Sequence, residues 1–320
     1  MGDAKKEGIL KLAILAVLVV AMIFLAHFLI FKAANHKVLP DKEAKIVATN
    51  FAAYDFARAV VGDNDKVSVD MLLKPGTESH DYEPTPQDIA TISNADLFIY
   101  VGGESEDWVD KLLDSNEINR ENVVRMMDLV DLKKEDAHDG DSNDIEYDEH
   151  IWTSPKNARI LVDKIKQKMI YKFPQFKESF EVNAGLYESE LEDIDTELSR
   201  IVKDAKTTEL VFADRFPFKY LVDDYGLTYV AAFPGCAEQT EASSATIAEL
   251  INKVKSDNLS AVLKIELTSD KLAQTVSEAT GAKILTLNAA HNISQEDFDK
   301  GIRLVDLMRD NMVVLAEALN

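Results

Sequence analysis

The chain has 320 residues, of which 46% are hydrophobic, and its 57 acidic residues exceed its 35 Lys and Arg, for a formal net charge of −22. A chain of this length can bury a sizeable core, and it predicts two lobes rather than one small domain. The acidic excess argues against a nucleic-acid partner, because binding phosphates needs basic surface, and it suits an exported protein that attracts cations.

The N-terminal segment is the most apolar part of the chain. Leu12–Phe31 contains no charged side chain, and at 1.5 Å per residue it spans about 30 Å, the thickness of a bilayer's hydrocarbon core. Three lysines precede it, which favours a cytoplasmic N-terminus and export of the residues after the segment. We interpret residues 1–36 as a membrane anchor. A cleaved signal peptide is the alternative, although Lys32-Ala33-Ala34 is a poor cleavage site.

Strands alternate with helices in the first half of the chain. The patterns predict strands at 45–49, 67–73, 97–101 and 123–127, and helices at 54–61, 86–93 and 108–113. This alternation is typical of βαβ units and a mainly parallel sheet.

An acid-rich stretch over residues 135–149 interrupts this alternation and ends at His150. It holds eight Asp and Glu residues, with His138 among them, and its composition is typical of a solvated loop. Two interpretations stay open: a solubilising loop, or a loop whose negative potential attracts cations. Ser154-Pro155 then indicates the start of a helix.

One long amphipathic helix is predicted between Phe176 and Ala205, because apolar residues recur there at spacings of three and four. Such a helix would run between two lobes. We therefore divide the chain into the anchor or signal segment 1–36, an N-terminal lobe at 37–170, a linking helix at 171–206 and a C-terminal lobe at 207–320.

The second half repeats the same alternation. Strands are predicted at 210–213, 227–232, 261–265 and 283–287, and helices at 218–224, 244–256, 270–279 and 295–319. The predicted fold class is α/β, with two lobes of mainly parallel sheets joined by one long linking helix, plus the N-terminal transmembrane or signal helix.

Four histidines lie in predicted loops: His80, His138, His150 and His291. His80 is in a stiff connection, after a Pro-Gly turn and before Pro84, and loops at strand ends are where α/β proteins place functional side chains. Histidines from separate loops can converge in a cleft and bind zinc or similar metals. The alternative is that they are ordinary loop histidines satisfied by hydrogen bonds.

Two motifs resemble those of the metal-binding solute-binding proteins of ABC transporters, which import zinc or manganese. The run Pro75-Gly76-Thr77-Glu78-Ser79-His80-Asp81-Tyr82-Glu83-Pro84 resembles the first-ligand motif, and Asp148-Glu149-His150-Ile151-Trp152-Thr153-Ser154-Pro155 resembles the second. The resemblance covers residues 45–320. It implies two α/β lobes on either side of a long helix, with the metal between them.

On this resemblance His80 and His150 are the ligands of the N-terminal lobe. The third-ligand position falls on Arg215, which cannot coordinate a metal, so Asp214 beside it is a candidate. The fourth ligand is usually an aspartate after the last strand, and the nearest candidate here is His291.

Two further candidates lie in the segment 233–241. Cys236 would supply a thiolate, which suits zinc, although a small buried residue in a tight turn is the alternative. Glu241 would bind the metal, cap the following helix or support a ligand. Three histidines favour Zn2+ over Mn2+, which prefers more oxygen donors.

The resemblance implies an extracytoplasmic protein that captures a divalent metal ion and delivers it to an ABC permease, without catalysis. The N-terminal helix would tether it to the outer face of the membrane, or a cleaved form would be secreted or periplasmic. A surface adhesion or sensor protein with an altered metal site is one alternative. A zinc hydrolase is another, but it would need a general base such as Glu238 or Glu241, and no HExxH motif is present.

Overall fold

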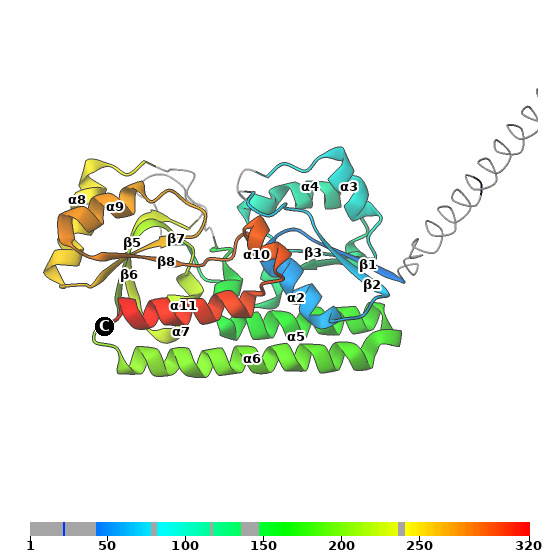
Figure 1. Ribbon diagram of the computed structural model, residues 1–320. Helices are drawn as coiled ribbons and strands as arrows, with labels where there is room; N and C mark the ends of the chain where they lie inside the picture. The colour runs from blue at the N-terminus through cyan, green and yellow to red at the C-terminus, as the bar shows by residue number, and fades with distance from the viewer. Residues whose placement is uncertain (1–21, 23–42, 78–81, 116–117, 136–146, 236–240) are drawn as a thin grey trace, which may run out of the picture. The chain divides into compact units, whose positions relative to one another are not determined.

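The computed structural model describes residue 22 and residues 43–77, 82–115, 118–135, 147–235 and 241–320. The chain divides into residues 1–41 and a compact unit at 42–320, and the strands of the described ranges all belong to the latter (Figure 1). No helix in the described ranges is long and apolar enough to cross a membrane. The predicted anchor at Leu12–Phe31, apart from Met22, lies outside those ranges.

The N-terminal lobe is built on a four-stranded parallel sheet in the order β2-β1-β3-β4. Its strands are β1 (Ala44–Ala48), β2 (Val67–Met71), β3 (Leu97–Tyr100) and β4 (Val123–Arg125), and its helices are α2 (Phe51–Val61), α3 (Pro86–Ser93) and α4 (Asp107–Asp114). Short 3-10 turns complete it: η1 (Glu104–Glu106), η2 (Arg120–Asn122), η3 (Met126–Leu129) and η4 (Ile151–Thr153).

The C-terminal lobe repeats this plan with a parallel sheet in the order β6-β5-β7-β8. Its strands are β5 (Glu209–Phe216), β6 (Thr228–Pro234), β7 (Ala261–Ile265) and β8 (Lys283–Leu287), and its helices are α7 (Lys219–Tyr225), α8 (Ser244–Ser256) and α9 (Lys271–Thr280). The two α/β lobes with parallel sheets confirm that part of the predicted fold class.

Two long helices connect the lobes in the sequence, and the second of them spans both lobes. They are α5 (Pro155–Lys172) and α6 (Lys177–Asp204), separated by the short turn η5 (Pro174–Phe176). With 28 residues, α6 is about 42 Å long at 1.5 Å per residue. It packs against α2 and α5 on the N-terminal side and against α7 and α11 (Leu304–Ala318) on the C-terminal side (Figure 1).

The buried face of α6 carries the apolar residues whose spacing predicted the helix: Phe180, Ala184, Tyr187, Leu191, Ile194, Leu198 and Ile201. One apolar core runs from Ile46 and Leu97 through this face to Leu263 and Leu287. Each sheet has a second, separate core on its other face, under α3 and α4 in one lobe and under α8 and α9 in the other.

The prediction of one final helix at 295–319 was wrong in one respect, because two helices are found there. Gly301 adopts a left-handed φ of 73° between α10 (Gln295–Asp299) and α11. The Arg303 N–H then donates to the Asp306 carboxylate at 3.0 Å, which starts the new helix. The break lets α10 reach the N-terminal lobe, where Phe298 packs against Tyr54 of α2 with ring centroids 5.6 Å apart.

Candidate metal centre

His150 lies in the segment that leads from β4 to α5, directly before η4. Its side chain is completely buried. Its main-chain N–H donates to Asp148 Oδ1 at 2.8 Å, and its Nδ1 lies 3.0 Å from the same oxygen. With Nδ1 turned toward a carboxylate, Nε2 is the nitrogen that a metal would meet. A carboxylate behind an imidazole fixes the orientation of the ring and increases its basicity toward a metal.

The electrostatics of His150 favour a cation at this position. Burial alone would lower the pKa of the imidazole, but the charge and hydrogen bond of Asp148, with Glu149 and Glu135 adding to them, raise it overall. The same acids that hold a proton on the ring would favour a bound metal ion in its place.

His291 approaches His150 from the segment that follows β8 of the other lobe. The two ring centroids are 4.4 Å apart, with the planes at 85°. Trp152 contacts both rings, with centroid distances of 5.6 Å to each. Its indole N–H donates to the Ala289 carbonyl at 2.8 Å, so one side chain of the N-terminal lobe supports the approach of His291.

The turn that presents His291 is held by Glu266, at the end of β7. The Ala289 and Ala290 N–H groups donate to its two carboxyl oxygens at 2.7 and 2.8 Å. Ala290 has a left-handed φ of 56°, a strained conformation that these bonds help to maintain. Burial raises the pKa of Glu266 to about 7. Sequence analysis missed this residue because nothing local indicates its partners.

His80 lies outside the described residues, but the residues that bracket it reach the same region. Thr77 lines a cavity of about 100 Å³ together with His291 and Arg215. Tyr82, on the other side of His80, lines a second cavity with His291 and Trp152. The Gly76 N–H donates to the Ile293 carbonyl at 2.8 Å, which joins the His80 loop to the segment after His291.

Asp214 and Glu241 lie in a different cavity, of about 530 Å³, beside α8 and α9, which Arg215 also lines. The Asp214 carboxylate already accepts hydrogen bonds from the Arg215 N–H at 2.8 Å and the Ile265 N–H at 3.2 Å. It also accepts one from the Thr268 hydroxyl. Asp214 would have to give up these bonds to bind a metal, and Glu241 is exposed.

Cys236 also lies outside the described residues, but Gly235 before it lies close to His150. A Cβ atom on Gly235 would come within 2.9 Å of His150 Cε1. The carboxyl end of β6 therefore approaches the imidazole from the C-terminal lobe.

Two buried carboxylates border the histidines, and sequence analysis gave neither a role. The Ser105 hydroxyl donates to Glu149 Oε1 at 2.7 Å, and the Gly102 N–H donates to Glu106 Oε2 at 2.7 Å. Burial, with the Glu149 charge, raises the pKa of Glu106 to about 7. The acid directly before His150 was the sequence signal that could have identified Glu149.

This arrangement can hold a soft or borderline divalent ion through imidazole nitrogens, with acids behind them. Within the ranges that the structure describes, no group of three or more His, Cys, Asp and Glu side chains is placed to hold a metal. His80 and Cys236 fall outside those ranges. The described part thus contributes an imidazole pair, not a complete coordination shell.

Comparison with known proteins relates residues 46–318 to the family model for component A, periplasmic, of the zinc-uptake complex. The zinc-binding lipoprotein AdcA of Streptococcus pneumoniae is 32% identical over 292 residues, covering 89% of this chain. The chain spans only 58% of that relative's length. The high-affinity zinc uptake system protein ZnuA of Bacillus subtilis is 32% identical over 281 residues, covering 86% of this chain and 87% of the relative.

A solved structure agrees with the fold. The crystal structure of the Zn(II)-bound ZnuA-like domain of Streptococcus pneumoniae AdcA matches with a TM-score of 0.72 and 32% identity, covering 86% of this chain and 98% of that domain.

Proposed function

This chain belongs to the family of periplasmic zinc-uptake components, and we propose that it is the extracytoplasmic solute-binding protein of an ABC importer. It would capture one divalent metal ion between its lobes and deliver it to the permease. The observation that carries this proposal is the approach of His150 and His291 from opposite lobes, with ring centroids 4.4 Å apart.

We propose zinc as the metal, because imidazole is among its preferred ligands, and manganese, which prefers more oxygen donors, as the second choice. The zinc-binding names of the relatives support this order. His80 and His150 would be the ligands of the N-terminal lobe and His291 that of the C-terminal lobe. Cys236 is the first candidate for a fourth ligand, ahead of Asp214 and Glu241, because the adjoining Gly235 lies close to His150.

We propose the same division of the chain as above. Residues 37–170 form the N-terminal lobe, 171–206 the linking helix and 207–320 the C-terminal lobe. We propose that residues 1–36 tether the protein to the outer face of the membrane, and the lipoprotein name of a relative supports an extracytoplasmic place. The protein binds and releases its cargo and carries out no reaction.

The test is metal binding by the full-length chain, purified without a histidine tag. Stripped protein titrated with zinc should melt several degrees higher, because a ligand at 100 times its Kd adds about 2.7 kcal/mol to the free energy of unfolding. His150→Ala and His291→Ala should lose most of this shift, whereas His36→Ala, outside the proposed site, should keep it.

A chain that binds none of zinc, manganese, iron, nickel and copper would contradict the proposal. That outcome would favour the alternative of an adhesion or sensor protein. Arg215, which cannot bind a metal at the third-ligand position, is the reason to consider it.

A further inference from the structure

Tyr220, on α7 of the C-terminal lobe, is completely buried and bonds to the other lobe. Its hydroxyl donates to the Asp148 carbonyl at 2.8 Å and accepts from the Lys133 N–H at 3.1 Å. Burial raises the pKa of this hydroxyl, so it remains a donor over the whole physiological range. One side chain therefore satisfies two main-chain groups across the boundary between the lobes.

These two main-chain groups lie on either side of the base of the acid-rich stretch, Lys133 two residues before it and Asp148 next to its last residue. The Asp148 N–H donates to the Lys133 carbonyl at 3.0 Å, and Lys134 and Tyr147 form an isolated antiparallel bridge. The base of the stretch is thus a short paired segment, and the Tyr220 hydroxyl bonds to both of its sides. The Lys133 ammonium adds an ion pair at 3.2 Å to Asp223, which is also on α7.

Asp148 links Tyr220 to the candidate metal centre, because it bonds to both Tyr220 and His150. Its carbonyl is held by Tyr220, and its carboxylate holds both the N–H and the Nδ1 of His150. Asp148 and His150 are both buried, so neither can turn without moving the other. A shift of α7 relative to the N-terminal lobe would therefore break two hydrogen bonds together and release Asp148 from its position.

We infer that Tyr220 is a positioning residue, which couples the seating of α7 against the N-terminal lobe to the orientation of the His150 imidazole. The inference rests on the proposed metal-binding function. While the lobes are together, Nε2 of His150 is held in place for the metal. When α7 shifts away from the N-terminal lobe, the Tyr220 bonds are lost, the ring is no longer fixed, and the ion is released more readily.

The experiment follows zinc alone as it leaves the full-length protein for an excess of a fluorescent chelator. Tyr220→Phe keeps the ring and removes the hydroxyl with both of its hydrogen bonds, and it should speed zinc dissociation about threefold to tenfold. The association rate should change little. Tyr225→Phe is the matched control, because this tyrosine of the same helix donates to Asp195 of α6 at 2.7 Å, away from His150.

A double-mutant cycle separates positioning from general loosening. Asp148→Asn should speed dissociation more than Tyr220→Phe, and adding Tyr220→Phe to it should have little further effect, because both act through one path. Dissociation unchanged in Tyr220→Phe, or equally faster in Tyr225→Phe, would overturn the inference. So would zinc release at the wild-type rate from Asp148→Asn, a result that does not depend on how well Tyr220→Phe folds.

Hydrogen exchange of the stripped protein distinguishes this inference from the proposed function. The Lys133 and Asp148 amides should exchange faster in Tyr220→Phe than in the wild type or Tyr225→Phe. If the wild type binds no zinc, the proposed function fails, and the exchange data still decide whether Tyr220 fixes the Asp148 segment. Unchanged exchange at both amides would refute the positioning role.

Discussion

At the scale of single residues, Trp152 contacts both histidines and forms a hydrogen bond from one lobe to the other. Its ring contacts both imidazoles, and its N–H reaches Ala289, two residues before His291. The sequence does not predict this hydrogen bond, because the acceptor is 137 positions away.

Trp152→Phe should weaken zinc binding and lower stability. The phenyl ring keeps part of the packing but leaves the Ala289 carbonyl without its donor, at a cost of about 1–3 kcal/mol. We expect a zinc affinity lower by about tenfold in a calorimetric titration, together with a lower melting temperature.

Trp108→Phe, in the wall of the same cavity, is the control for the loss of indole packing. The Trp108 N–H is buried and has no hydrogen-bond partner among the described residues, so its removal leaves no acceptor unsatisfied. Equal loss of zinc affinity in the two variants would contradict a specific role for the Trp152 hydrogen bond.

Glu106 gives a prediction about pH. Because burial raises its pKa from 4.5 to about 7, the folded protein retains a proton that the unfolded chain has already lost between these values. The contribution of Glu106 to the free energy of unfolding therefore falls as the pH rises from 4.5 to 7, by at most about 3 kcal/mol in total. Above pH 7 it is constant.

Glu106→Gln should remove this dependence. Urea unfolding of stripped protein should show the variant gaining stability relative to the wild type as the pH rises through that window. A difference between the two proteins that is the same at pH 4.5 and pH 7 would contradict the raised pKa.

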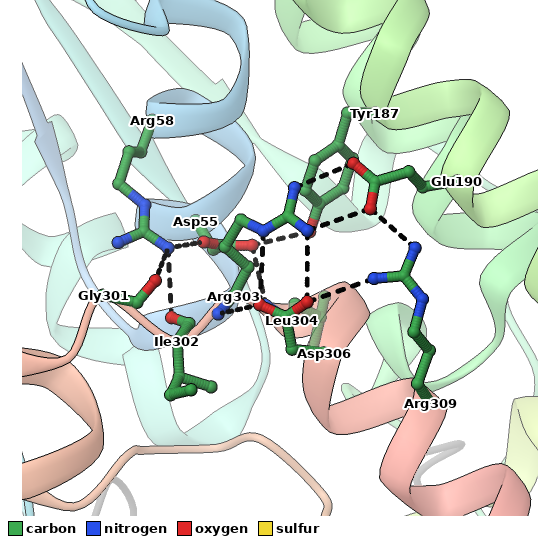
Figure 2. Close-up of polar contacts among 10 residues, drawn as sticks. All are labelled: Asp55, Arg58, Tyr187, Glu190, Gly301, Ile302, Arg303, Leu304, Asp306 and Arg309. Carbon is green, nitrogen blue, oxygen red and sulfur yellow. Dashed lines mark hydrogen bonds and ion pairs between the residues drawn. The ribbon is translucent and has the colours of Figure 1, made fainter.

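At the scale of elements, three helices meet in one polar cluster (Figure 2). Asp55 of α2 is completely buried and accepts from the Tyr187 hydroxyl of α6 at 2.6 Å and from the Leu304 N–H, the first of α11, at 2.9 Å. Arg303 then binds Glu190 of α6 through two bonds, at 2.8 and 2.9 Å. An acid at the N-terminus of α11 is also favoured by the helix dipole.

Asp55→Ala should destabilise the fold by about 3 kcal/mol or more, because it leaves buried donors on two helices without an acceptor and removes a partner of Arg58. Urea unfolding would measure the change. Asp114→Ala is the control: this residue pairs with Arg120 at 2.8 Å, but its side chain is 80% exposed, so we expect a change below about 1 kcal/mol. Similar losses in both variants would mean that the cluster adds nothing specific.

The elements themselves were largely predictable from sequence, because alternation and apolar spacing are local properties. The buried face of α6 and the strands of both sheets follow them. The break before α11 was not predicted: its apolar pattern continues past Gly301, and the Asp55 bond that fixes the new N-terminus comes from a residue 249 positions earlier. His150 could be identified from its motif, which is local in the sequence. Tyr220 and Glu266 could not, because their partners are far away in the sequence.

At the scale of the whole folded unit, the chain passes between the lobes more than once, through α6 and again through the segment that leads from β8 to α10 and back along α11 (Figure 1). One apolar core extends through both lobes. Wide opening would have to break this core as well as the cluster around Asp55, so we expect only small rigid-body movement.

Small-angle X-ray scattering can check this. The radius of gyration of the stripped protein should fall by less than about 1 Å when zinc is added, because packed helices shift by small amounts. A fall of several ångströms would show that the lobes separate widely, and that the joint between α2, α6 and α11 opens with them.

Gly103 and Gly235 bear no metal-binding atom, yet each lies against a residue of the site. A Cβ atom on Gly103 would lie 2.6 Å from that of Glu149, and one on Gly235 would lie 3.0 Å from the Phe216 carbonyl as well as against His150. A single methyl group at either position would therefore displace Glu149 or His150. A natural variant with alanine at 103 or 235 should therefore bind zinc more weakly, even though every candidate ligand in its sequence is intact.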